Sequence, residues 1–193
     1  MTLEEPASLG PDDVRVGDAY EAVRSDERRR IAELKRPRRI HLGDALELVF
    51  ENRETIRSTV QEALRTERIE APDRVADEIA AFNAVVPAPG ELAAALFLEV
   101  ADPADINAAV MRFEGIEQAV FIEVAGMRTR GVPEEVFPRG ESAVAHYLRF
   151  RLEPEQREAI LKGSAVVAGS DHPSCTVTVA LDEDQRHAIA ADL

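Results

Sequence analysis

Residues 117–132, EQAVFIEVAGMRTRGV, restrict the fold more than any other stretch of the chain. Val, Phe and Ile within 117–124 are typical of a β-strand, and Ala125-Gly126 suits a tight turn before a second strand over 127–132. A turn this short joins antiparallel strands, because parallel neighbours need a crossover of about a dozen residues or more. We therefore expect an antiparallel hairpin at this point.

Similar patterns on both sides of the hairpin extend the prediction. The other expected strands are an extended segment from Ile40 to Phe50 with a turn near Gly43-Asp44, and residues 91–100, 142–152, 165–168 and 176–181. The expected helices cover residues 11–36, 53–69, 72–85, 103–113, 154–161 and 182–191. Short turns favour antiparallel pairs, although residues 100–117 leave room for one parallel crossover. We predict an α+β fold, with a largely antiparallel sheet of about five to seven strands and helices packed on it.

A chain of 193 residues suits one domain. Residues 1–10 show no hydrophobic periodicity, so we expect a flexible tail followed by a single α+β domain over 11–193. No apolar run approaches 18 residues, which excludes a membrane-spanning helix, and the acidic N-terminus is not typical of a secretory signal. Cys175 is the one cysteine, so we expect a cytoplasmic protein without disulfides.

The net charge of −14 is distributed unevenly. Residues 1–39 contain nine acidic and nine basic residues, whereas residues 40–193 contain 28 acidic and 14 basic residues. The acidic body should repel nucleic acids and acidic membranes. Residues 28–39 hold seven basic residues but no aromatic ones, so stacking on single-stranded nucleic acid is not supported. We therefore do not expect a nucleic-acid-binding or membrane protein.

The helix expected over 53–69 is the densest polar element. Steps of three and four residues place one ribbon of side chains along it: Glu54, Arg57, Gln61, Arg65 and Arg68. The ribbon is either a solvated face with short-range ion pairs, or one wall of a polar cleft that faces Arg38 and Arg39. In the second interpretation, Glu51 and Glu62 would serve as a general base or as metal ligands.

Two histidines are the other candidates. His146 lies on the apolar face of the strand over 142–152, with Arg149 on the opposite face, and a lone histidine there is more often a core residue than a ligand. Asp171-His172-Pro173 is either an ordinary turn or a titratable pair on a loop. His146, His172 and Asp171 would together match a site of two histidines and one carboxylate for iron or another divalent metal. Cys175 is not expected to be a nucleophile, because the side chain of His172 should point away from it.

The chain carries no GxGxxG, GxxxxGK[ST], HExxH, CxxC or GxSxG motif. It does, however, contain a set of segments in a fixed order. These are Lys35-Arg36, Arg38-Arg39 and Leu42-Gly43, followed by FENRETIR, QEALRTERI, GELAAALFLEV, GIEQAVFIEV, HYLRF and DHP. The ordered set resembles a bacterial family called domain of unknown function 3501, and the resemblance covers about residues 11–192.

The resemblance implies a small cytoplasmic protein whose genes lie beside those of rubrerythrin-like proteins and iron–sulfur oxidoreductases, and hence a redox protein partner. It marks as family-like Arg38, Arg39, Glu51, Gln61, Glu62, Arg65, Glu67, His146, Arg149, Asp171 and His172. The chain departs from the family pattern at Ala63, where a methionine is expected, at Cys175, where an aromatic residue is expected, and at Glu141, where a basic residue is expected.

Two hypotheses follow. In the first, the protein is a small-ligand or metal-dependent enzyme, or an enzyme-associated protein, linked to redox chemistry, and acts on a small-molecule substrate. Its catalytic residues would be Glu51, Glu62, His146 and His172, its ligand-binding residues Arg38, Arg39, Gln61, Arg65 and Arg149, and its metal ligands His146, His172 and Asp171. In the second, the protein is a non-catalytic module that docks through its acidic body on a rubrerythrin-like or iron–sulfur partner.

Overall fold

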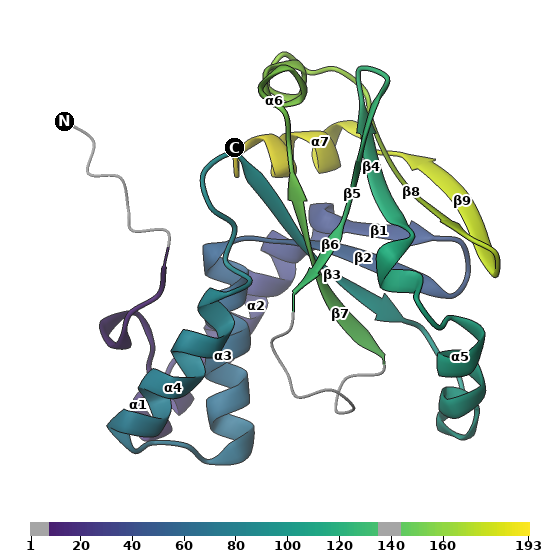
Figure 1. The fold of residues 1–193 in the computed structure, drawn as a ribbon. Coiled ribbons are helices and arrows are strands. Elements are labelled where there is room, and N and C mark those ends of the chain that lie inside the picture. The colour runs from purple at the N-terminus through teal and green to yellow at the C-terminus, as the bar shows by residue number, and fades with distance from the viewer. Residues whose placement is uncertain (1–7, 135–143) are drawn as a thin grey trace.

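Nine strands and seven α-helices form within residues 8–134 and 144–193, the parts of the chain that the computed structural model describes (Figure 1). The helices are α1 (Gly17–Glu21), α2 (Arg24–Lys35), α3 (Arg53–Glu67), α4 (Pro72–Asn83), α5 (Ile106–Arg112), α6 (Pro154–Leu161) and α7 (Glu183–Ala190). The strands are β1 (Arg39–Leu42), β2 (Leu46–Glu51), β3 (Glu91–Leu98), β4 (Val120–Val124), β5 (Met127–Arg130), β6 (Val132–Glu134), β7 (Ala145–Arg151), β8 (Val166–His172) and β9 (Cys175–Ala180).

The strands form two antiparallel sheets. The larger has the order β1-β2-β3-β7-β6 and the smaller has the order β5-β4-β8-β9. The predicted α+β class with antiparallel pairing is confirmed, but the strands divide into two sheets rather than one. The parallel crossover left open between residues 100 and 117 does not form, because β3 and β4 lie in different sheets and every pair among the described strands is antiparallel.

The hairpin expected over 117–132 is present as β4 and β5. Ala125 and Gly126 both have positive φ angles, 51° and 76°, as a two-residue turn of the tightest hairpin type requires. After β5 the chain continues through Gly131 into β6 and so passes from the smaller sheet to the larger. A Cβ atom on Gly131 would lie 3.2 Å from side-chain atoms of Leu148 and Phe150, so the absence of a side chain lets the crossing strand lie close to β7.

The main hydrophobic core lies between the two sheets. The larger sheet contributes Ile40, Leu42, Leu46, Leu48, Phe50, Leu92, Ala94, Leu96, Leu148 and Phe150, and the smaller contributes Val120, Ile122, Val124, Val166 and Ala168. The alternation read from residues 142–152 therefore holds, since Leu148 and Phe150 both enter this core.

Helices cover the other face of the larger sheet. Figure 1 shows α1 to α4 gathered on that side, and a second core joins Ile56, Val60, Leu64, Val75, Ile79 and Phe82. Helix α3 begins at Asn52, whose side-chain oxygen accepts a hydrogen bond from the Thr55 amide, and ends at Arg68 in the left-handed conformation.

Three local predictions differ from the structure. The helix expected over 11–36 is divided into a short turn at Pro11–Asp13, α1 and α2. The segment between the strands expected over 165–168 and 176–181 is mostly strand itself, because β8 runs to His172 and β9 begins at Cys175. Leu9, expected in a flexible tail, is buried, and its amide donates to the side-chain oxygen of Asn83. Residues 1–7 of that tail, most of the loop over 133–141 with Glu141, and the first residues of the strand expected from 142 lie outside the described residues.

Candidate functional site

The larger sheet separates the residues that the first hypothesis would bring together. Glu51 lies opposite Ala93, which in turn lies opposite Arg149, so Glu51 and Arg149 share the helix-covered face. His146 is three residues from Arg149 and therefore points to the opposite face, toward the second sheet. The structure does not bring Glu51 and His146 into one pocket.

Glu51 is buried under the helices. It is 2% exposed, and one carboxylate oxygen accepts a hydrogen bond from Lys35 Nζ at 2.8 Å. The other oxygen, Oε2, is buried without a hydrogen-bond partner among the described residues. Burial and the negative charge of Glu51 together raise the pKa of Tyr147 on the same face of the sheet. Lys35 and Glu51 thus tie α2 to β2.

Arg38 and Arg39, expected to bind a ligand, are both engaged within the chain. Arg38 is buried and donates to both carboxylate oxygens of Asp192 and to the carbonyl of Ala188. Asp192 also accepts from the side-chain Nδ2 of Asn52 at 3.0 Å. Arg39 donates to Glu47 at 2.6 Å. In this structure the side chains of both arginines bind other residues of the chain and so stabilise the fold.

The polar face of α3 binds the N-terminal helices. Glu62 accepts hydrogen bonds from the Arg24 guanidinium and from the Tyr20 hydroxyl, all at 2.9 Å. Gln61 accepts from the backbone amide of Arg15, and Arg65 donates to Glu21. Burial alone would raise the pKa of Glu62, but the bonds from Arg24 and Tyr20 hold it below its ordinary value.

These bonds predict a pH-dependent contribution of Glu62 to stability. A carboxylate whose pKa is lowered on folding stabilises the protein above its unfolded pKa, and this contribution is lost as the pH falls through the folded pKa. Glu62→Gln should therefore destabilise the protein near neutral pH, and the difference from the wild type should shrink toward about pH 3. Urea unfolding at both pH values measures this difference in the free energy of unfolding. Glu67→Gln, an exposed position on the same helix, is the control, and an equal difference at both pH values would contradict the role of Glu62.

Arg149 joins three elements. Its guanidinium donates to Glu134 on β6, to Glu91 on β3 and to the carbonyl of Ala84 at the end of α4. Burial opposes ionisation of Glu91, but hydrogen bonds from Arg149 and from the Ala88 amide outweigh it and lower the pKa of Glu91. Arg149 is therefore engaged on the helix-covered face.

Asp171 and His172 lie at the end of the β8–β9 hairpin. Hydrogen bonds from the Arg130 guanidinium lower the pKa of Asp171. The Nδ1 atom of His172 accepts from the Ser174 amide, and its Nε2 atom lies 3.1 Å from the carbonyl of Glu114. To bind a metal, His172 would have to give up the bond of one of its two ring nitrogens. Nearby, burial raises the pKa of the Cys175 thiol, which disfavours the reactive thiolate.

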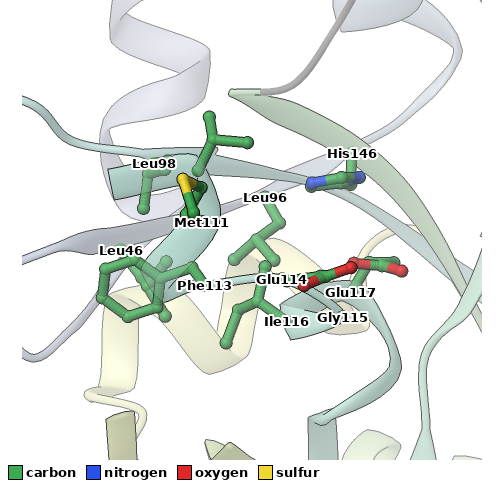
Figure 2. Close-up of a pocket in the computed structure, with 11 residues that line it drawn as sticks. Leu46, Leu96, Leu98, Met111, Phe113, Glu114, Gly115, Ile116, Glu117 and His146 are labelled. Carbon is green, nitrogen blue, oxygen red and sulfur yellow. The ribbon is translucent and has the colours of Figure 1, made fainter. Parts of the chain in front are cut away.

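An apolar pocket of about 370 Å³ lies between the larger sheet and residues 110–117. Figure 2 shows its apolar side chains grouped together, with His146 and the carboxylates of Glu114 and Glu117 at one side. The lining residues are Leu46, Leu96, Leu98, Val110, Met111, Phe113, Glu114, Gly115, Ile116, Glu117 and His146. We refer to His146, Glu114 and Glu117 as the polar rim.

Gly115 shapes this wall of the pocket. Its φ of 81° ends the helical segment that contains α5 and turns the chain into a short 3-10 turn at Ile116–Gln118. Phe113 and Ile116, on either side of Gly115, are both buried against the core, whereas Met111 is 78% exposed. Of the predicted site residues, His146 lies in this pocket, and His172 borders it through Phe113, whose ring centre is 6.1 Å from that of His172.

The sequence did not identify this pocket. Its walls come from β2, β3, β7 and residues 110–117, which are far apart in the chain. One available signal was Glu114-Gly115-Ile116-Glu117, where two carboxylates flank a turn next to apolar residues. A different group, His41, Glu47 and Glu99, has the composition of a metal site within the described residues. No helix in the described part of the chain is both long and apolar enough to cross a membrane.

Comparison with known proteins identifies the family. The model of a family described as "Protein of unknown function (DUF3501)" matches residues 8–193. The chain belongs to the DUF3501 family. The resemblance found over residues 11–192 is thereby confirmed. Among curated proteins no match was found for this DUF3501 chain.

A solved structure supports the DUF3501 fold described above. It is the crystal structure of a "novel protein of unknown function" from Burkholderia pseudomallei K96243, with 30% sequence identity and a TM-score of 0.89. The match covers 96% of this chain and 99% of the Burkholderia chain. The arrangement of two sheets and a helical layer is thus shared with a protein from that bacterium.

Proposed function

We propose that this DUF3501 protein binds a small molecule with an apolar body and a cationic head group, such as an aliphatic or aromatic amine. The observation that supports the proposal is the 370 Å³ pocket with apolar walls and a polar rim. Ligand pockets in proteins are concave and mostly apolar, with a few polar groups that orient the ligand. The pocket has this composition and a volume sufficient for a small ligand.

The charge of the rim supports the choice of head group. Glu114 and Glu117 place two carboxylates beside the imidazole of His146 (Figure 2). An ammonium group would be attracted to these carboxylates, whereas a carboxylate or phosphate would be repelled by them and by the acidic body of the protein. His146 is the group at the rim that could exchange a proton with such a ligand. Binding, rather than a defined reaction, is the function proposed.

Methionine methyl NMR can test this directly, because the chain has three methionines and, of the two that the structure describes, Met111 lines the pocket and Met127 does not. Hexylamine, hexanol and hexanoate share one apolar body and differ in the head group. At about pH 8, where an ordinary histidine is neutral, hexylamine should shift the Met111 methyl signal saturably and bind more tightly than the other two. The Met127 signal should not move. If none of the three compounds shifts the Met111 signal saturably, the proposal is wrong.

Three variants test whether hexylamine binds in the pocket. Leu98→Trp should fill the pocket and weaken hexylamine binding at least about tenfold, which corresponds to about 1.4 kcal/mol. Leu161→Trp replaces an exposed leucine on α6 and should leave binding unchanged. Glu114→Gln combined with Glu117→Gln should remove the preference for hexylamine over hexanol. Equal binding of hexylamine by the Leu98 and Leu161 variants would place the ligand outside the pocket and would contradict the proposal.

A further inference from the structure

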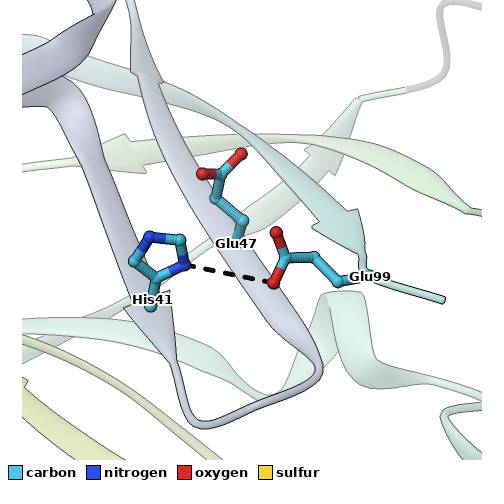
Figure 3. A group of neighbouring side chains, drawn as sticks. All are labelled: His41, Glu47 and Glu99. Carbon is cyan, nitrogen blue, oxygen red and sulfur yellow. Dashed lines mark ion pairs between the residues drawn. The ribbon is translucent and has the colours of Figure 1, made fainter. Parts of the chain in front are cut away.

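A group of metal-ligating side chains lies on the other face of the strands that line the pocket. Leu46 and Leu98 line the pocket, and their chain neighbours Glu47 and Glu99 point to the opposite face together with His41 (Figure 3). Each of His41, Glu47 and Glu99 offers one ligand atom, and these atoms all lie within 4.8 Å of one another. The Nδ1 atom of His41 is 4.0 Å from a carboxylate oxygen of Glu99.

Sheet hydrogen bonding fixes the backbone positions of all three residues. His41 and Glu47 are directly opposed in the β1–β2 pair. The amide of Glu99, the residue after β3, donates to the carbonyl of Ala45 at 2.8 Å and so holds Glu99 at the start of β2. Two of the three residues thus lie on paired strands and the third is hydrogen-bonded beside them, so little backbone entropy is lost when a ligand binds.

Glu47 is the buried member of the group. Every residue of β2, LELVFE, is buried, and Glu47 is only 8% exposed. A buried carboxylate is costly unless it is paired. Arg39 donates to one oxygen of Glu47 at 2.6 Å, but its own side chain is 45% exposed, so this pair is partly screened by solvent. Glu47 therefore carries a buried negative charge within 4.8 Å of ligand atoms of His41 and Glu99, and a metal ion at that place would neutralise it more fully than the half-exposed Arg39 does.

We propose that His41, Glu47 and Glu99 bind a divalent first-row transition metal ion such as Zn²⁺, Mn²⁺ or Fe²⁺. One imidazole and two carboxylates suit these ions, and three protein ligands leave further coordination positions for water or a small ligand. Metal–ligand bonds of about 2.0–2.2 Å require the three ligand atoms to lie roughly 3 Å apart. Rotation of His41 and Glu99, whose side chains are 64% and 47% exposed, can close this gap around a fixed Glu47. The site does not depend on the pocket or on its ligand.

Titration of the full chain without a purification tag tests the site. With Zn²⁺ in isothermal titration calorimetry, we expect one ion per chain, and at least a tenfold loss of affinity in His41→Ala, Glu99→Gln and Glu47→Gln. The control His187→Ala removes an exposed histidine outside the group and should bind as the wild type does. With Co²⁺, the wild type should show a hyperfine-shifted imidazole proton signal that His41→Ala lacks. His41→Ala changes an exposed side chain, so the test stands even if the Glu47 variant does not fold.

Arg39 offers a second test. It competes with the metal for Glu47, so Arg39→Met should bind Zn²⁺ more tightly than Arg36→Met, which removes an equal charge from an exposed neighbouring position. Equal affinities of these two variants would contradict the role of Glu47. The proposal is overturned if no stoichiometric binding is found, or if His41→Ala and His187→Ala bind Zn²⁺ equally well.

Discussion

Asp192→Ala should lower the free energy of unfolding by about 3–5 kcal/mol, the largest effect expected for any single change considered for this protein. Asp192 neutralises Arg38, and the two side chains are 7% and 4% exposed. Removal of the carboxylate leaves the guanidinium buried without its counter-charge and removes the acceptor for the side-chain Nδ2 of Asn52. The cost is therefore the desolvation of a charge that is no longer paired, rather than the loss of a surface ion pair.

Urea unfolding followed by circular dichroism measures this loss. Asp77→Ala removes an exposed aspartate from α4 and should change the free energy of unfolding by less than about 0.5 kcal/mol. The double variant Arg38→Met with Asp192→Leu removes both charges and should recover most of the stability, since apolar pairs often replace buried ion pairs at little cost. A double variant as unstable as Asp192→Ala would show that the charge on Arg38 is not the cause.

Gly169→Ala should destabilise the protein by about 3 kcal/mol, because β8 has no room for even one methyl group. A Cβ atom on Gly169 would lie 2.6 Å from a ring carbon of Phe121 and 2.6 Å from the carbonyl oxygen of Val177. Phe121 is buried and is covered on its ring face by the Arg128 guanidinium, 3.7 Å from the ring centre, so the ring cannot move away freely. The carbonyl of Val177 belongs to the neighbouring strand β9 and is fixed by pairing.

The melting temperature and urea midpoint of Gly169→Ala can be compared with those of Gly10→Ala. At Gly10 the nearest atom to a new Cβ is 3.8 Å away and the backbone is extended, so the change should be within about 0.5 kcal/mol of neutral. Phe121→Leu combined with Gly169→Ala should relieve one of the two contacts but not the contact with Val177. A stable Gly169→Ala protein would mean that β8 and β9 separate more easily than their packing indicates.

The parts of the fold governed by short-range pattern could be predicted from the sequence. Alternation along β7 correctly assigned Leu148 and Phe150 to one face and Arg149 to the other, because period-two burial is a local property of a strand. Division into two sheets could not be predicted, since it depends on Gly131 and on which strands meet across the core. A glycine in the sequence shows that the backbone can approach its neighbours closely, but it does not show which sheet the chain joins next.

The candidate site was harder to predict for a related reason. Residue types identified Glu51, Glu62 and Arg38 as unusual, but their partners Lys35, Arg24 and Asp192 lie 16, 38 and 154 residues away. A charged side chain opposite a distant partner has the same local pattern as one that faces a ligand. Most residues that line the pocket are apolar, and their sequence pattern is the same as that of core residues. His146 lines the pocket because the alternation along its strand directs its side chain to that face.

The strand segment that passes through Gly131 also affects how the protein unfolds. Since β5 is paired with β4 and β6 is paired with β7, neither sheet can lose this strand without pulling on the other. The two sheets should therefore open together as one cooperative unit. The strands that line the pocket belong to this unit, so they should not separate without the opening of both sheets.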